Sequence, residues 1–463
     1  MQAVTDFVHQ LNFDDLPCEV VAQAQRCLLD LVGVAAAGHA TRLSRILGDF
    51  VCSQYPGEVP LLFSARTASA CGAALFGAML IDSLDAHDGQ VLTKGHVGVA
   101  ILPALLASAH ERTLDGPEFI TALVLGYEIA TRAGIALHRT ACDYHTSGAW
   151  NGIGVAAVVA RMRGLDSRQT LEAMGAAEFY GPRSQMMRCI DHPTMLKDGS
   201  GRGALAGISS ALLAEAGFTG APAVTLCDES VADIWGDLGQ RWYILEQYFK
   251  AYPVCRWAQP AVEAVRELRR VPGFDVERIR EVHIYSFHEA TRLHKVHPAT
   301  TEEAQYSLPF SVASALLDGV VTAQAIAETD EGLQQPQRRA LAGMIRMHEH
   351  SDYSALFPAE RWAHARLVMD DGSVLSSQPA IARGNPENPL SVDELIEKFH
   401  SLSAPLLPAV VREQIQQQTL NLQALDSRAL SRFIALLSAS RATDGRLPDN
   451  LEPRSLLQSN EPA

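Results

Sequence analysis

The chain has 463 residues, of which 47% are hydrophobic and 20% are charged, and its formal net charge is −15 at pH 7. This length exceeds what one hydrophobic core usually supports, so we expect two domains or one large domain with an appendage. Nucleic acids and anionic membranes require a cationic surface, so the acidic balance argues against both as partners. An anionic small molecule stays open, because a local basic pocket fits within an acidic protein.

The sequence shows no export signal or membrane anchor that we recognise. Residues 1–6 lack a basic segment followed by an apolar one, and the apolar stretch at 99–109 is interrupted by Pro103. That stretch is also shorter than the roughly 20 residues that a bilayer requires. The eight cysteines include no CxxC pair, as expected for reduced thiols. We therefore predict a cytoplasmic protein.

Helical periodicity dominates the first half of the chain. Apolar residues three and four apart predict a helix that begins near Pro17 and ends at Gly38. Proline at a first-turn position, as in Asp115-Gly116-Pro117, marks another helix start. Further helices are predicted over 70–81, 103–112, 117–137, 151–163, 167–177 and 203–216. Successive helices with short glycine-rich links predict an all-α bundle.

The pattern changes after Pro260. One more helix, 261–270, precedes a strand over 279–285, and strands over 365–369 and 373–376 flank an Asp-Asp-Gly hairpin signal. Helices are expected at 311–317 and 323–328, between the first strand and the hairpin. The section from about 270 to 390 is therefore predicted to be a smaller α+β domain. Ser391 and Glu394 form a capping box that opens the next helix, and two more helices follow. The end from Pro448 is expected to fray.

A polar cluster follows the buried helix at 70–81. It comprises Asp85-Ala86-His87-Asp88-Gly89-Gln90 and, five residues later, His96. His87, Asp88 and His96 are conceivable metal ligands, but no helical HxxxH or HxxE spacing supports that interpretation, and we predict no metal site. The alternatives are a hydrogen-bonded wall of a polar pocket and a purely structural cluster.

Two groups able to move protons bracket the small-residue helix at 151–163. Tyr144 and His145 precede it, and Lys197 follows in a glycine-rich loop before the next helix. A histidine titrates near neutrality, and a lysine in a confined site can act as a base. An exposed surface lysine is the alternative for Lys197.

Cations downstream could hold a substrate carboxylate. Arg256 could form a bidentate pair with such a carboxylate. Lys250 lies near it in the sequence, and His294 lies in the predicted α+β domain. Salt links between the two domains are an equal alternative for these residues. The sequence has no GxGxxG motif, Walker loop or GxSxG elbow, so nucleotide-dependent chemistry and serine hydrolysis have no support. These residues predict a cofactor-free pocket for proton abstraction next to a carboxylate.

An ordered set of motifs, spread over nearly the whole chain, resembles the MmgE/PrpD family. The motifs are Leu84-Asp85-Ala86-His87-Asp88-Gly89 with His96, His145-Thr146-Ser147-Gly148, Lys197-Asp198-Gly199, Gly217-Phe218-Thr219-Gly220, Lys250-Ala251-Tyr252-Pro253 and Ser307-Leu308-Pro309-Phe310. The resemblance implies a mainly α fold, with a helical domain built from both chain ends (1–267 with 391–450), an α+β domain (268–390) and a tail (451–463). It also implies a homodimer that requires no cofactor.

Departures from the family pattern bear on the reaction. Dehydratases of this family typically carry Asp-Asp-Thr-His where this chain has His87-Asp88-Gly89-Gln90, and histidines where Ser200 and Gln259 stand. Dehydration needs an acid to expel hydroxide, so these differences favour epimerisation of a dicarboxylate such as iminodisuccinate. A 2-methylcitrate dehydratase-like hydro-lyase and a non-catalytic helical scaffold dimer are the alternatives.

The resemblance also gives the candidate residues separate roles. Lys197 and Tyr144 are the expected pair of bases, with His145 as the alternative to Tyr144, and His145 and Asp88 tune them. The residues expected to hold the carboxylates of the small anionic substrate are His96, His87, Arg202, Arg256, Lys250 and His294.

Overall fold

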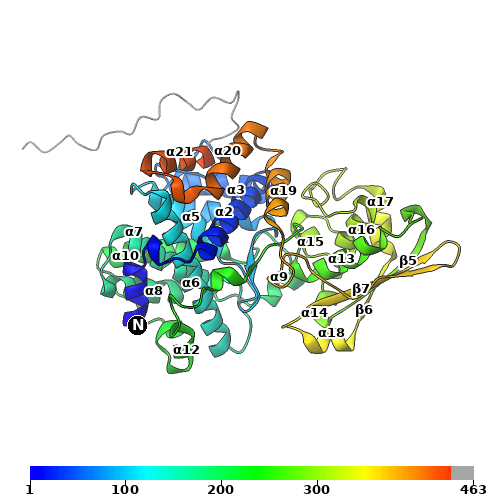
Figure 1. Cartoon of the computed structure of the whole chain (residues 1–463), viewed down its shortest axis with the longest axis horizontal. Coiled ribbons are helices and arrows are strands. Elements are labelled where there is room, and N and C mark those ends of the chain that lie inside the picture. Colours follow the sequence, from blue (N-terminus) through cyan, green and yellow to red (C-terminus); the bar gives the residue numbers. More distant parts are fainter. Residues whose placement is uncertain (439–463) are drawn as a thin grey trace, which may run out of the picture.

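The computed structural model describes residues 1–438, so the predicted tail at 451–463 and the last residues of the predicted helical domain lie outside the described part. A large helical part lies beside a smaller part that carries a β-sheet (Figure 1). The predicted mainly α class is confirmed.

Long buried helices form the centre of the helical part. The middle of this bundle is α7 (Asn151–Arg163), which packs against α6 (Gly116–Thr140), α10 (Ser200–Glu215) and α5 (Gly98–Ala109). Glycines permit this close approach, since a Cβ placed on Gly152 would lie 2.6 Å from the Gly203 carbonyl oxygen. The contact between α7 and α10 fixes the two loops that precede these helices.

Two helices, α2 (Cys18–Gly38) and α6, are long and apolar enough to cross a membrane by length and composition alone. Their apolar windows are 78% and 94% buried against the rest of the protein. Such burial is typical of core helices and is compatible with a soluble protein.

Two predicted helices differ from the structure. The helix expected over 103–112 is α5 and begins earlier, at Gly98, because Pro103 fits inside it against Gly77 of α4 (Ala70–Asp82). The helix expected over 323–328 is wrong. There the hydroxyls of Thr322 and Thr329 accept backbone N–H groups, so the segment forms turns instead.

The smaller part is built on a sheet with the strand order β6-β5-β7-β8, and β9 (Ala380–Ile381) also pairs with β7. The predicted strand is β5 (Ile279–Ser286), which pairs antiparallel with β7 (Trp362–Met369), and the predicted hairpin joins β7 to β8 (Val374–Ser376). The parallel edge strand β6 (Ile345–Glu349) was not expected, because Arg, His and Glu alternate in it with few apolar residues.

The chain returns to the helical part after the sheet. The capping box of Ser391 and Glu394 is present and opens α19 (Val392–Ser403), which packs against α2. Helices α20 (Ala409–Leu420) and α21 (Ser427–Ser438) follow on the same side (Figure 1). The helix α13 (Gln259–Leu268) packs against β7 and α16 (Leu308–Asp318).

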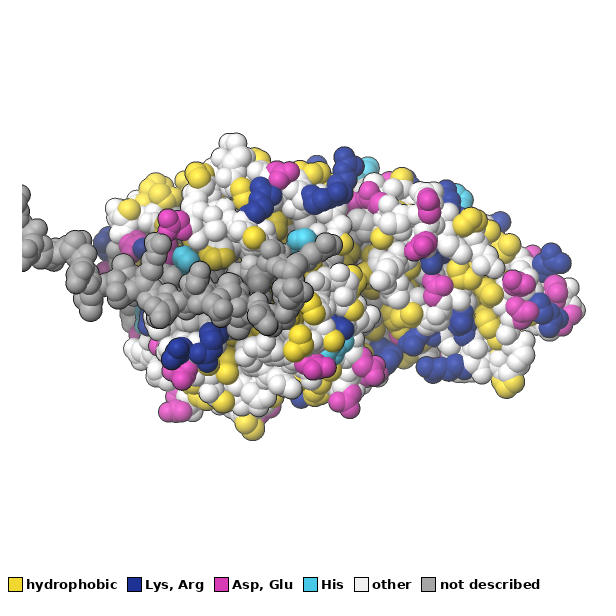
Figure 2. Space-filling view, turned by 90° about the horizontal axis from the view of Figure 1, so that it is seen from above, with side chains coloured by type: hydrophobic (Ala, Val, Ile, Leu, Met, Phe, Trp, Pro, Cys, Tyr) yellow, Lys and Arg dark blue, Asp and Glu magenta, His cyan; other side chains and the backbone are white. Residues whose placement is uncertain are grey.

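The remaining helices complete both parts of the molecule. They are α1 (Gln2–Gln10), α3 (Arg42–Gln54), α8 (Ser167–Tyr180), α9 (Met187–Asp191), α11 (Val224–Cys227), α12 (Ala232–Trp235), α14 (His288–Thr291), α15 (Thr301–Gln305), α17 (Pro336–Met344) and α18 (Ser351–Leu356). Figure 2 shows acidic and basic side chains interspersed over one face of the molecule.

Candidate active site

A small cavity of about 50 Å³ lies where the helical part meets the α+β part. It has room for only a few water-sized groups. Its walls come from the loop after α4, the segment before α10, the stretch 248–257, and two residues of the α+β part. The lining residues are Asp85, Lys94, His96, Met186, Cys189, Ile190, Asp198, Tyr248, Lys250, Cys255, Arg256, Trp257, Tyr306 and Arg361.

A buried ion pair forms one wall of this cavity. Lys250 and Asp85 are 1% and 4% exposed, and the Lys250 ammonium donates a hydrogen bond to Asp85 Oδ1. Burial alone would raise the pKa of Asp85, but Lys250 and then Lys197 hold that pKa well below its usual range. Burial would likewise lower the pKa of Lys250, and Asp85 raises it. Both groups therefore stay charged at neutral pH.

His96 lies against this ion pair. Its Nδ1 is 2.6 Å from the Asp88 carbonyl oxygen, which can only accept, so Nδ1 carries the proton and the lone pair on Nε2 faces Lys250 Nζ at 3.5 Å. Burial, and then Lys250, lower the pKa of His96 well below its usual value, so the ring is neutral. His87 lies behind it, with its Nε2 3.4 Å from Asp82 and the two ring centroids 4.3 Å apart.

Asp85, His87 and His96 each bring one possible ligand atom within 4.8 Å of the others. A metal ion would need the lone pairs of Asp85 and His96. The Lys250 ammonium already lies against both of these groups, so the cluster holds a lysine. The prediction of no metal site stands as a prediction.

Lys197 is buried next to the cavity, at 3% exposed, and has a φ of 51°, in the left-handed region that residues with a side chain rarely adopt. Its Nζ donates to Gln305 Oε1 and lies 5.1 Å from the centroid of the Tyr306 ring. Gln305 is held by its Nε2, which donates to the Ser83 carbonyl oxygen at 3.0 Å. Within the described residues no carboxylate forms an ion pair with Lys197. Its hydrogen-bond partner is therefore an uncharged amide in a fixed orientation.

Asp198 is an acid that sequence reasoning did not single out, although it belongs to the Lys197-Asp198-Gly199 motif. It lines the cavity and accepts a hydrogen bond from the Ser147 hydroxyl. The Ser147 oxygen in turn accepts a hydrogen bond from the backbone N–H of His96 at 2.8 Å. Burial, and then Asp82, raise the pKa of Asp198 to about 8. The raised pKa favours the protonated carboxylic acid, the form that can donate a proton.

The predicted second base lies outside the cavity lining. Tyr144 is 36% exposed, and the cavity residue Lys94 places its Nζ 3.8 Å from the centroid of the Tyr144 ring. The His145 Nδ1 is 3.2 Å from the Asp143 carbonyl oxygen, and the His145 backbone N–H donates to His138 Nε2. Tyr144 thus approaches the cavity by way of Lys94, whereas His145 contacts its own loop and the end of α6.

Three other predicted residues also lie away from the cavity. The Asp88 carboxylate accepts a hydrogen bond from the Tyr127 hydroxyl at 2.7 Å, and burial followed by Asp30 raises its pKa to about 7. Only the Asp88 carbonyl oxygen faces His96. Arg202 and His294 are exposed. Of the predicted residues, the structure brings together His96, Lys250 and Arg256, with Lys197 adjoining them.

The charge of the lining favours an anion. Four cations, Lys94, Lys250, Arg256 and Arg361, face one ionised carboxylate, that of Asp85. Arg256 donates to the Arg383 carbonyl oxygen at 2.7 Å and to Asn385, and burial lowers its pKa only to about 10. Within an acidic protein this cavity is therefore a local basic site.

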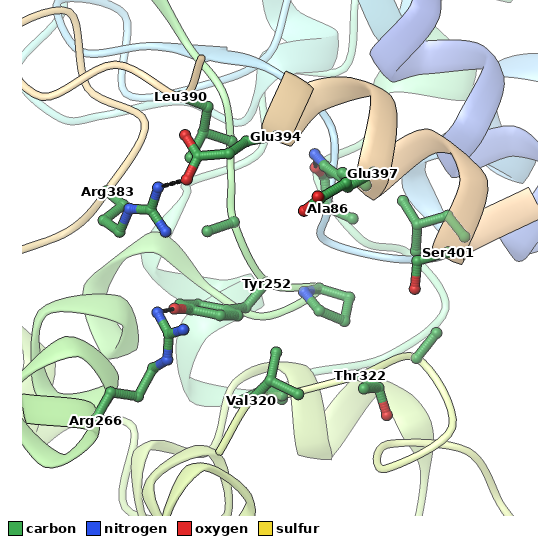
Figure 3. A pocket seen from close by; sticks show the side chains of 16 residues that line it. Ala86, Tyr252, Arg266, Val320, Thr322, Arg383, Leu390, Glu394, Glu397 and Ser401 are labelled. Atoms are coloured by element: carbon green, nitrogen blue, oxygen red, sulfur yellow. Dashed lines mark hydrogen bonds and ion pairs between the residues drawn. The ribbon is translucent and has the colours of Figure 1, made fainter. Parts of the chain in front are cut away.

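A second cleft, of about 260 Å³, lies on the other side of the segment 250–253 (Figure 3). Most of its charged side chains are paired, since Arg383 binds Glu394, Arg266 binds Glu263 and Lys398 binds Asp30. Tyr252 faces this cleft while Lys250 faces the cavity. The paired charges indicate a seam between the two parts of the molecule.

Comparison with known proteins identifies the family. The MmgE/PrpD N-terminal domain matches residues 2–235, and the MmgE/PrpD C-terminal domain matches residues 252–423. The chain belongs to the MmgE/PrpD family. Cis-aconitate decarboxylase from Homo sapiens is 23% identical over 453 residues, covering 90% of this chain and 91% of that protein. The cis-aconitate decarboxylase-like protein oryM from Aspergillus oryzae is 21% identical over 482 residues, covering 94% and 96%.

Proposed function

We propose that this MmgE/PrpD protein is a cofactor-independent enzyme that moves a proton at the carbon next to a carboxylate of a small di- or tricarboxylate. The observation that carries the proposal is the contrast between its two buried lysines. Lys250 is paired with Asp85, whereas Lys197 donates only to the uncharged Gln305 amide. A neutral Lys197 amine keeps that hydrogen bond and still has a lone pair to accept a proton.

The surrounding groups supply the rest of such a reaction. Proton abstraction places negative charge on the substrate carboxylate, and the Lys250 and Arg256 cations at the cavity would stabilise that charge. The proton must return from another group for the configuration to invert. Tyr144 and His145 are the candidates from the sequence, and Asp198 is the protonated acid that lines the cavity.

The leading reaction is epimerisation of iminodisuccinate, which needs only a base and a proton donor on opposite faces of one carbon. Decarboxylation of cis-aconitate is the second candidate, because the two relatives above bear that name. Dehydration of a 2-methylcitrate-like substrate is a third, and the glutamine and serine at positions 259 and 200 count against it.

Solvent exchange distinguishes these reactions. One stereoisomer of iminodisuccinate incubated with the enzyme in D₂O should gain deuterium at the α-carbon and invert, as followed by NMR. Lys197→Met should abolish both changes, while Lys295→Met, at an exposed lysine paired with Glu303, should leave them intact. Release of CO₂ from cis-aconitate, with no deuterium exchange into iminodisuccinate, would establish the decarboxylase instead. An unsaturated product from a 2-methylcitrate-like substrate would establish the dehydratase.

We also propose that the enzyme is a homodimer. The proposal is supported by Phe179, Tyr180 and Leu196, which are 76%, 55% and 77% exposed and which a second subunit would remove from water. A non-catalytic scaffold dimer would share this surface but would gain no thermal stability from dicarboxylates.

A further inference from the structure

Arg361 is a half-buried arginine whose guanidinium has no hydrogen-bond acceptor among the described residues. It lies in the link between α18 and β7, and its Nε is buried with no hydrogen bond. Among the described residues it donates no hydrogen bond and forms no ion pair, and its guanidinium carbon lies 5.9 Å from the centroid of the Phe357 ring. The side chain as a whole is half-buried, and its buried Nε carries a donor without a protein acceptor. A buried donor without an acceptor costs free energy that a bound ligand would recover, which indicates a role in binding.

The neighbouring arginine is already engaged. Arg256 donates to a backbone carbonyl, to Gln259 at 3.2 Å and to Asn385, and its guanidinium lies 4.6 Å from the centroid of the Tyr248 ring. These acceptors are all uncharged, so Arg256 contributes positive charge but has few free donors. Arg361 has the free donors that a carboxylate requires for a bidentate contact.

Arg361 also lies between two hollows. It lines the 50 Å³ cavity beside Lys250, and it lines a wider cleft of about 480 Å³ that Arg256, Trp362 and Glu387 share. The cavity alone is too small for a whole dicarboxylate, and Arg256 and Arg361 line both hollows, so the cleft is the adjoining space into which a substrate could extend. A carboxylate at its far end would then meet Arg361.

We infer that Arg361 anchors the carboxylate of the substrate that lies farthest from the reacting carbon, and so selects substrates with two carboxylates. This inference rests on the proposed function. It assigns the α+β part a direct role in recognition, because Arg361 comes from the sheet side of the molecule while Lys197 and His96 come from the helical part.

Binding of two unreactive acids tests the inference without turnover. Succinate and butyrate have the same carbon skeleton length and differ by one carboxylate, and their dissociation constants can be measured by calorimetry. The unaltered enzyme should bind succinate more tightly. Arg361→Gln should weaken succinate binding by roughly 10- to 100-fold and leave butyrate binding nearly unchanged, as expected for loss of a charge-assisted hydrogen-bonded contact.

The controls separate the possible failures. Arg366→Gln changes an arginine of the adjoining strand β7 that lies outside both hollows, and it should keep the preference for succinate. Arg361→Lys keeps the positive charge but lacks the paired N–H donors of the guanidinium, so it should lose part of the preference for succinate. This variant serves as the test if Arg361→Gln does not fold. A preference for succinate that persists in both Arg361 variants overturns the anchor but leaves the proposed function standing. An unaltered enzyme that binds neither acid overturns the proposed function.

Discussion

Removing the carboxylate from the buried ion pair at the cavity should destabilise the protein in a way that depends on pH. In Asp85→Asn the Lys250 side chain, which is 1% exposed, loses the partner that raises its pKa against the effect of burial. Breaking a buried pair in this way typically costs about 3–5 kcal/mol.

The size of the loss has an upper limit, because Lys250 can release its proton. Deprotonating a lysine of ordinary pKa, about 10.4, costs about 4.6 kcal/mol at pH 7 and about 1.9 kcal/mol at pH 9. In the variant the folded-state pKa of Lys250 falls below its unfolded value, so the unfolded chain binds more protons and stability rises with pH. In the unaltered protein both charges persist across this range, so the deficit of the variant should shrink by more than half between pH 7 and pH 9.

Urea unfolding at the two pH values measures this deficit. The double variant Asp85→Asn/Lys250→Met removes both charges and should recover much of the stability. Asp49→Asn, in an exposed pair with Arg66, is the control and should change stability far less. A deficit for Asp85→Asn that is below about 1 kcal/mol, or that is the same at both pH values, would refute the view that Asp85 holds Lys250 as a buried ammonium.

Three further outcomes are expected. Lys197→Met should lower kcat by roughly 10²-fold or more while leaving succinate affinity within a few-fold, since general bases contribute about that much. Light scattering should give twice the 50.1 kDa chain mass, and Phe179→Asp with Leu196→Asp should give the monomer. Asp198 should contribute a fall in melting temperature as pH rises from 5 to 8, because burial raises its pKa in the folded state and the unfolded chain releases the proton near pH 4. Asp198→Asn should reduce that slope, and an unchanged slope would contradict the raised pKa.

The sequence was informative where the signals are local. Spacing of apolar residues predicted α2 and α7, and the capping box predicted the start of α19, because these features depend on neighbours in the chain. The edge strand β6 escaped prediction because its pairing with β5 is long-range and its own residues are mostly polar. The same distinction explains the turns at 323–328, where threonine hydroxyls outcompete helical bonds.

The site residues show the same difference between local and long-range signals. Residue type and setting, and then motif resemblance, singled out Lys197, Lys250 and His96, and the structure places these near one cavity. Arg361 gave no signal, because nothing in the sequence around it differs from an ordinary strand entry and its importance comes only from lacking an acceptor after folding. Gln305 likewise looks unremarkable until its amide is seen to join Lys197 to the backbone of Asp85.

Gln305 also explains how the two buried lysines come to have different partners. Its Oε1 accepts from both the Asp85 backbone N–H and Lys197 Nζ, while the Asp85 carboxylate is turned to Lys250. The carboxylate therefore forms an ion pair with one lysine, and the amide accepts a hydrogen bond from the other and orients it. An amide at this position is chemically important for that reason: a carboxylate in place of Gln305 would hold Lys197 as an ammonium and remove the lone pair that proton abstraction requires.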